Sequence, residues 1–283
     1  MKLPFALAQR FVAAEKFKET IPKIKAFNEK NIKVTLDLLG ENVQEKSMAD
    51  ETVDIYIQLL DDIQHAGLTS SISIKLTMIG LDIDENYCRD NLFRLLNKAR
   101  DHGSFVRIDM EGSAYTQQTI DIFKEAFKEY GNHVGIVIQA YLHRSGEDVP
   151  ELADLGADIR LCKGAYKEPD LIAIQKMPAI REAFKEYAKI LLEKTPFPRI
   201  ATHDDELINW TLHYTSENNI PKERFEFQML YGLREETMEQ FARDGHHARV
   251  YVPYGTMWFP YFKRRLMERK ENVWFVMNTM FKK

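Results

Sequence analysis

The sequence predicts an α/β protein whose strands and helices close into a (β/α)8 barrel. Short runs rich in β-branched residues alternate with longer segments of helical period, and about eight such strand–helix units follow one another in 283 residues. Repeated units of this kind imply parallel strands, and eight of them in one domain of roughly 250 residues suffice for a closed barrel. A doubly wound sheet is the alternative, but no GxGxxG motif follows the first strand.

The predicted elements follow one another without a Gly/Ser/Pro linker or a low-complexity tract. The expected strands are KVTLDLL from Lys33, SISIKL from Ser71, FVRIDM from Phe105, VGIVIQAY from Val134, DIRLCKG from Asp158, RIATHD from Arg199, FEFQML from Phe225 and ARVYVP from Ala248. The helical segments 86–103 and 116–131 each end at a glycine, which is typical of helix C-termini. We expect residues 1–30 to form a helical preface and 31–283 to form the barrel domain.

Composition narrows the possible functions. A net charge of -4 and a pI near 6.1 argue against a nucleic-acid partner. Two cysteines exclude a disulfide framework and a cysteine-rich metal site, and we predict no metal centre. The charged first thirty residues predict no signal peptide, and the longest apolar stretch, GIVIQAYL, is far shorter than the roughly 20 residues of a spanning helix. We therefore expect a cytoplasmic protein, at most peripheral at the inner face of the cell membrane.

Each predicted strand has one apolar face and one polar face when it is divided by the two-residue period of a strand. Helices cover the apolar faces of a barrel, so the polar faces are predicted to line its lumen. We expect acidic and basic side chains there to pair, because an unpaired buried charge costs several kcal/mol. The predicted lumen residues are Thr35, Asp37, Ser71, Ser73, Lys75, Arg107, Asp109, Glu111, Gln139, Tyr141, Arg160, Glu226, Gln228, Arg249 and Tyr251.

The segment YFKRRLMER, after the eighth strand, places a group of polar side chains on one helix face. As an ordinary surface helix it would carry only solvated charge. A helix that begins just beyond the C-terminal mouth, where barrel enzymes have their active sites, instead brings two guanidiniums over that mouth. One can provide a bidentate fork for a carboxylate and the other a further contact. The four residues on this face are Tyr261, Arg264, Arg265 and Glu268.

Eight segments, in order, resemble the signature segments of proline dehydrogenase, both the monofunctional bacterial enzymes and the flavin domain of the bifunctional proline utilisation protein. The resemblance covers about residues 30 to 275 and implies a distorted (β/α)8 barrel that binds FAD at the C-terminal ends of its strands. The segments are VTLDLLGE, SIKLT, VRIDMEGS, IVIQAYL, RLCKGAYKEP, IATHDDELI, FEFQMLYGLR and RVYVPYGTMWFPYFKRRLMER.

The resemblance also implies site residues. Lys75, Asp109 and Arg160 would be catalytic, with Arg160 near flavin N5. The substrate L-proline would be bound by Lys75, Asp109, Leu230, Tyr251, Tyr261, Arg264, Arg265 and Glu268, the arginines taking its carboxylate. The cofactor would contact Gln139, Arg160, Lys163, Gly164, Ala165, Thr202 and His203.

The activity implied by the resemblance is the first step of proline catabolism. FAD-dependent oxidation by hydride transfer would give Δ1-pyrroline-5-carboxylate, and the electrons would pass to a membrane quinone. Two other hypotheses remain open. Lys75 inside a strand would also suit a lyase or aldolase that forms a Schiff base, and a barrel can serve as a non-catalytic binder of small molecules.

Overall fold

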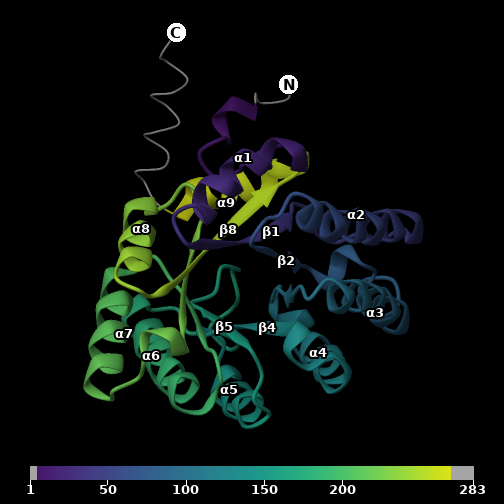
Figure 1. Cartoon of the computed structure of the whole chain (residues 1–283). Helices are drawn as coiled ribbons and strands as arrows, with labels where there is room; N and C mark the ends of the chain where they lie inside the picture. The colour runs from purple at the N-terminus through teal and green to yellow at the C-terminus, as the bar shows by residue number, and fades with distance from the viewer. Residues whose placement is uncertain (1–4, 269–283) are drawn as a thin grey trace.

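Eight parallel strands form a closed barrel in the computed structural model, which describes residues 5–268. The strands pair in chain order, and β1 closes the ring by pairing with β8 from Ile32↔Ala248 to Leu38↔Tyr254 (Figure 1). The predicted barrel is therefore confirmed. Its strands are β1 (Ile32–Leu38), β2 (Ser70–Ile74), β3 (Val106–Ile108), β4 (Val134–Gln139), β5 (Ile159–Cys162), β6 (Arg199–Ala201), β7 (Glu226–Leu230) and β8 (His247–Tyr254).

Helices separate successive strands, as the parallel topology requires. They are α1 (Phe17–Asn28), α2 (Lys46–His65), α3 (Glu85–Asp101), α4 (Thr116–Tyr130), α5 (Ser145–Asp154), α6 (Met177–Lys194), α7 (Asp205–Glu217), α8 (Glu235–Arg243) and α9 (Trp258–Glu268). Short 3-10 turns lie at Phe5–Leu7, Leu76–Met78, Ser113–Tyr115, Gly131–His133 and Lys222–Arg224. Within residues 5–268, every helix is too short or too polar to cross a bilayer.

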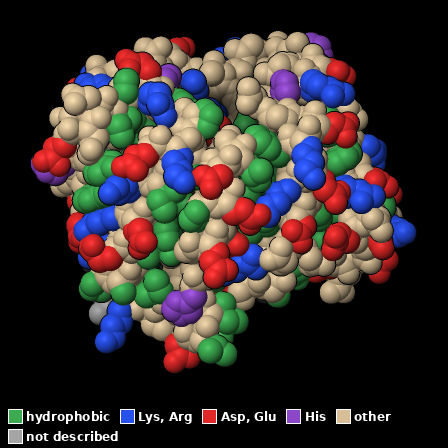
Figure 2. All heavy atoms as spheres, turned by 90° about the horizontal axis from the view of Figure 1, so that it is seen from below, with side chains coloured by type: hydrophobic (Ala, Val, Ile, Leu, Met, Phe, Trp, Pro, Cys, Tyr) green, Lys and Arg blue, Asp and Glu red, His purple; other side chains and the backbone are tan. Residues whose placement is uncertain are grey.

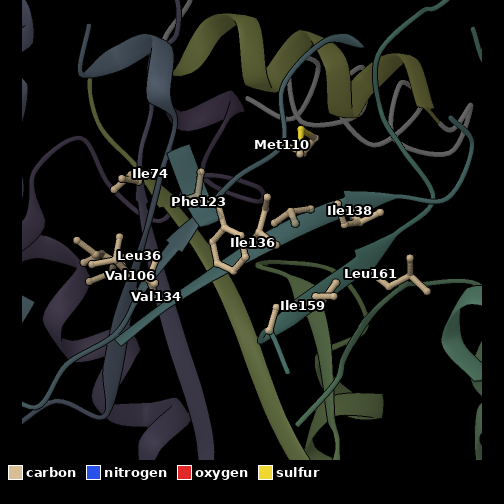
Figure 3. Packing of buried hydrophobic residues seen from close by; sticks show 14 of the residues in the cluster. Leu36, Ile74, Val106, Met110, Phe123, Val134, Ile136, Ile138, Ile159 and Leu161 are labelled. Carbon is tan, nitrogen blue, oxygen red and sulfur yellow. The ribbon is translucent and has the colours of Figure 1, made fainter. Parts of the chain in front are cut away.

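The outward faces of the strands form the main hydrophobic core beneath the helices. Leu36, Ile74, Val106 and Ile136 are fully buried there, and Phe123 of α4 lies beside Ile136 (Figure 3). β-branched and leucine side chains alternate with polar ones along most of the strands, so most of the apolar side chains face the helices. This alternation directs the polar side chains inward.

The lumen is filled by ion pairs. Glu226, with no exposed surface, accepts hydrogen bonds from Arg249 Nε and Arg199 Nη1, both at 2.8 Å. Closer to the N-terminal ends of the strands, Arg107 pairs with Asp158, which also binds Arg199. Since buried charges require partners, these contacts offset the desolvation of the whole set.

Glu111 does not join this network, although its place in the strand pattern put it in the lumen. It accepts hydrogen bonds from the Thr77 hydroxyl at 2.6 Å and the Thr77 backbone N–H at 3.2 Å. Burial raises its pKa above the usual range of a glutamate. Asp158 and Arg199, which the alternation did not assign to the lumen, supply the pairing instead.

The barrel is distorted at its eighth helix. In a regular barrel this helix would cover the outside of β8, but α9 follows β8 and reaches the C-terminal mouth, where Arg264 and Arg265 line a cavity. The outside of β1 and β8 is covered by α1 and α8. Phe17 of α1 packs edge-on against Tyr254 at a centroid distance of 6.3 Å, and Ile24 is fully buried.

A separate hydrophobic cluster fixes α9 in place. It joins α9 to the segment that precedes α1 and to the loop after β1, and it comprises Leu7, Ala8, Phe11, Val12, Leu39, Trp258, Tyr261 and Phe262. The same segment is hydrogen-bonded to the end of β8, through Ala13 N to Pro253 O at 2.9 Å and Gly255 N to Ala14 O at 3.0 Å. The position of α9 therefore depends on residues near the N-terminus.

The face seen in Figure 2 carries acidic and basic side chains interspersed with hydrophobic ones. No single sign of charge dominates that face. It offers no broad electrostatic attraction for a polyanion on this side of the molecule.

Gly135 provides a test of the packing in the lumen. A methyl group at this position would collide with Arg107 Nη1 and lie 2.6 Å from the Asp158 carbonyl oxygen. We expect Gly135→Ala to lower the free energy of unfolding by about 1–3 kcal/mol, measured by urea denaturation. Gly146→Ala is the matched control, because its methyl group would meet only the Tyr187 hydroxyl at 3.4 Å. Equal stability of the two variants would contradict the account.

Candidate active site

A cavity of about 520 Å³ opens at the C-terminal mouth of the barrel, beneath α9. Side chains from the ends of most strands converge on it, together with the loops after β1 and β5. Its walls combine apolar groups such as Val137, Met229 and Leu230 with charged ones from several elements. A concave, largely apolar space with a few convergent polar groups is typical of a small-molecule site.

Lys75 and Asp37 form a buried ion pair at the floor of the cavity. Lys75 Nζ lies 2.7 Å from Asp37 Oδ1, and the two residues are 8% and 1% exposed. Burial alone would lower the pKa of Lys75, but the carboxylates of Asp37 and Asp109 outweigh this effect and raise it. Lys75 is therefore an ammonium group at neutral pH, which suits binding of an anion and not attack as a free amine.

Asp109 is the centre of a second network beside this pair. Its Oδ1 accepts from Arg160 Nη1 at 2.8 Å and from Ser73 Oγ at 2.9 Å, while Oδ2 accepts from the Tyr251 hydroxyl at 2.7 Å. Burial and the Asp109 charge raise the pKa of Tyr251 well above its usual value, so the phenol remains a donor. Arg160 also lies over the Tyr251 ring, 5.3 Å from its centroid.

α9 contributes two guanidiniums to the lining of the cavity. Arg264 lies over the Tyr166 ring at 5.2 Å and 4.0 Å from Glu41, and its side chain is 25% exposed. Arg265 is more buried, at 9%, and lies over the Tyr261 ring at 5.4 Å. Both arginines line the cavity. They can together bind a carboxylate that enters from the mouth.

A third group of donors lies at the ends of β5 and β6. Lys163 pairs with Asp204 at 2.9 Å, and Arg181 does the same. Although burial opposes it, these two cations lower the pKa of Asp204 to about 2. The backbone N–H of Leu230 donates to His203 Nε2 at 2.9 Å, which places the proton of a neutral His203 ring on Nδ1.

The backbone after β5 approaches Tyr141 closely. Gly164 has φ +115°, and a methyl group at this position would overlap the Tyr141 ring. Next to it, Ala165 N lies 3.4 Å from Gln139 Oε1, and Gln139 Nε2 donates to Glu111 O at 2.8 Å. Only glycine fits this conformation and this contact together.

Most of the site residues expected from the sequence come together in this one cavity. Gln139 lies behind the wall and supports the chain at Ala165 instead of lining it. Glu268 is the last residue of α9, and its side chain is outside the described part of the chain. The site residues that were expected from the sequence and that do line the cavity are Lys75, Asp109, Arg160, Lys163, Gly164, Ala165, Thr202, His203, Leu230, Tyr251, Tyr261, Arg264 and Arg265.

Four further residues of the cavity were given no role by the sequence. Asp37 was predicted in the lumen, but its pairing with Lys75 was not. Glu41, Tyr166 and Asp204 each contact a predicted site residue and lie in or next to the quoted segments. Their proximity to those segments was the available signal, since nothing in a single sequence tells which loop residue turns toward the mouth.

Fold and site together define a (β/α)8 barrel with a charged small-molecule site at its C-terminal mouth, the architecture of barrel enzymes. The proline dehydrogenase family model matches residues 20–278, and the chain belongs to this family of oxidoreductases.

Individual relatives agree with the family assignment. "Proline dehydrogenase 2" of Bacillus subtilis is 39% identical over 276 residues, covering 98% of this chain and 91% of the relative. "Proline dehydrogenase" of Deinococcus radiodurans is 36% identical, with 98% and 90% covered. The solved proline utilization A of Bdellovibrio bacteriovorus, inactivated by N-propargylglycine, superimposes with a TM-score of 0.85 at 27% identity. It covers 93% of this chain, which spans 33% of that longer protein.

The protonated state of Lys75 can be tested against the Schiff-base hypothesis. We expect incubation with pyruvate and cyanoborohydride to leave the Lys75 peptide unmodified, because its ion pairs keep the amine charged. Peptide mass spectrometry measures this, and the exposed Lys176 and Lys263 serve as internal controls for reductive alkylation. Preferential labelling of Lys75 would restore the lyase or aldolase alternative.

Proposed function

We propose that this protein is an FAD-dependent proline dehydrogenase. It oxidises L-proline to Δ1-pyrroline-5-carboxylate, the first step of proline catabolism, and its electrons pass to a membrane quinone during peripheral contact with the membrane. The observation that carries the proposal is that Arg264 and Arg265 line the same cavity of about 520 Å³ as Arg160 and Lys75. This arrangement suits a small zwitterionic acid held at its carboxylate and oxidised at its ring.

The residues around the cavity fit a flavin. Its size lies within the range of about 300–1,000 Å³ usual for cofactor sites. Arg160 and Lys163 supply cationic donors, and α7 begins directly after Thr202, His203 and its N-cap Asp204. Lys163, at the end of β5, is the cation of this group that can contact a phosphate. No dinucleotide-binding glycine motif is required by this mode of binding.

The flavin would be held by Arg160, Lys163, Gly164, Ala165, Thr202 and His203, with Gln139 supporting Ala165 from behind. When bound, FAD supplies the two-electron acceptor whose N5 takes a hydride from the carbon beside the proline nitrogen. The polypeptide contributes position and charge. Arg160 would supply a cation to the bound flavin and would stabilise negative charge that develops on its reduction.

The substrate is oriented by its two ends. Arg264 and Arg265 bind the carboxylate, and Tyr251, Tyr261 and Leu230 enclose the pyrrolidine ring. This grip holds the reacting carbon at one place in the cavity, which favours transfer through proximity. Asp109 acts on the substrate indirectly. It accepts hydrogen bonds from Arg160 and from the Tyr251 hydroxyl and so positions both.

Lys75 and Asp37 form the charged floor of the same space. Their ion pair is buried, and Lys75 remains protonated. The Lys75 ammonium can therefore stabilise a bound anion, while Asp37 balances its charge when no anion is bound. Its contribution to the reaction is electrostatic positioning, together with Asp109.

An absorbance spectrum tests the proposed function directly. We expect the purified protein to show a flavin spectrum that L-proline bleaches without oxygen and that a soluble quinone analogue restores. Tetrahydro-2-furoate keeps the ring and carboxylate but lacks the nitrogen, so it should perturb the spectrum without bleaching it. Absence of flavin, or a flavin that proline does not reduce, would refute the proposal.

Arg264 and Arg265, the proposed carboxylate clamp on α9, yield a second prediction. Replacing Arg264 or Arg265 with methionine removes a charge-assisted hydrogen bond of about 1.5–3 kcal/mol. Affinity for proline and for tetrahydro-2-furoate should therefore fall about tenfold or more, and kcat/KM should fall further because the reacting carbon is no longer held. Titration of the flavin spectrum measures the affinities.

Lys263→Met is the matched control for the clamp, since it removes a cation from the exposed side of the same helix. Its affinities should equal those of the parent protein, and all three variants should retain FAD. Undiminished binding of tetrahydro-2-furoate by Arg264→Met and Arg265→Met would show that the pair is ordinary surface charge.

A further inference from the structure

Gln228 lies between two charged groups of the lumen. It is on β7 and 3% exposed, and its Oε1 accepts a hydrogen bond from Arg160 Nε at 2.6 Å. Its Nε2 donates to Glu226 Oε1, also at 2.6 Å. The amide thus joins the guanidinium at the cavity to the ion pairs deeper in the barrel.

The two partners permit one orientation of the amide. A guanidinium has only donors and a carboxylate only acceptors, so Oε1 must face Arg160 and Nε2 must face Glu226. A rotated amide would place N–H against N–H at one end and oxygen against carboxylate oxygen at the other. The side chain of Gln228 is therefore fixed by chemistry as well as by packing.

Glu226 is the acceptor that fixes this orientation of the Gln228 amide. Burial would raise its pKa, but the guanidiniums of Arg249 and Arg199 outweigh burial and hold it far below the usual range. Because the carboxylate is ionised at neutral pH, it is an acceptor for Gln228 under the conditions of the reaction.

Gln228 holds Arg160 from the side opposite to its other partners. Asp109 and Ser73, which lie at the ends of β3 and β2, bind the Nη atoms, at 2.8 Å for Asp109 and 3.3 Å for Ser73. Gln228 alone among the described contacts binds Nε, and it comes from β7. Without it, the guanidinium can pivot about Asp109 while it keeps its charge.

We propose that Gln228 is a positioning residue that fixes the orientation of the Arg160 guanidinium toward the cavity. The inference rests on the proposed function, in which Arg160 lies beside the flavin. It gives a role to a neutral side chain: Gln228 links the Glu226 ion pairs to Arg160, one of the cations that line the cavity. Loss of this contact leaves the charge present but misplaced.

Two substitutions separate positioning from simple space filling. Gln228→Met keeps the volume but offers Arg160 no strong acceptor. Gln228→Glu keeps the acceptor for Arg160 and places a second carboxyl group against Glu226, where a proton shared by the two carboxyls replaces the amide donor. A space-filling role makes the methionine variant the milder change, whereas a positioning role makes the glutamate variant the milder one for the rate.

The measured quantities are the rate of flavin reduction by L-proline without oxygen, the flavin midpoint potential and the affinity for tetrahydro-2-furoate. In Gln228→Met we expect the rate to fall about tenfold or more, with unchanged affinity for the analogue, since the α9 clamp is intact. In Gln228→Glu the rate should lie between those of Gln228→Met and the parent protein. Its midpoint potential should stay close to that of the parent protein, because the new carboxyl shares a proton with Glu226 and adds no net charge.

Thr35→Val is the matched control, because Thr35 also faces the lumen at 1% exposure and its hydroxyl has no hydrogen-bond partner in residues 5–268. It should match the parent in rate and potential. Should Gln228→Met not retain FAD, Gln228→Asn takes its place, since its shorter side chain withdraws the amide from both partners.

Parent-like rate and potential in Gln228→Met, or a slower rate in Gln228→Glu than in Gln228→Met, would overturn the positioning role. Failure of proline to reduce the parent protein would instead refute the proposed function itself, so the two failures are distinguishable.

Discussion

The charge balance inside the barrel is the constraint on which the rest of the structure depends. Glu226 is completely buried and is held by Arg249 and Arg199, and a buried carboxylate without such partners would cost several kcal/mol. Most barrels fill this space with branched aliphatic side chains. Here the lumen is a polar network that continues through Gln228 to Arg160, so the stability of the interior and the geometry of the cavity floor are set by the same contacts.

The cavity is assembled from two parts with different origins. Its floor consists of side chains at strand ends, fixed by hydrogen bonds that cross the lumen, such as those of Asp109, after β3, to Arg160 of β5 and Tyr251 of β8. Its roof is α9, which is held by the small hydrophobic cluster around Phe11 and Phe262. Because these supports share few residues, substitutions in the lumen and in the N-terminal segment should perturb different halves of the site.

The period of two along the strands predicted the barrel and placed Arg160, Glu226 and Arg249 inside it. Pairing could not be predicted in the same way. Arg107 pairs with Asp158, 51 residues away, and not with Glu111. The two partners meet only because β4 lies between β3 and β5 in the closed barrel. Glu41 beside Arg264 is a similar case, since the direction of a loop side chain depends on the helix packed above it.

The relocation of α9 explains why the N-terminal segment is part of the barrel. A helix that lies over the mouth cannot also cover the outer face of β8, and an uncovered strand would expose apolar side chains such as Val250 and Val252. α1 and α8 cover this region instead, while the residues before α1 support α9 from the other side. The continuous segment up to the end of α1 therefore helps to cover the outside of β1 and β8 and also positions Arg264 and Arg265 through its contacts with α9. The candidate site and the outer cover of β1 and β8 thus both depend on packing by the N-terminal segment.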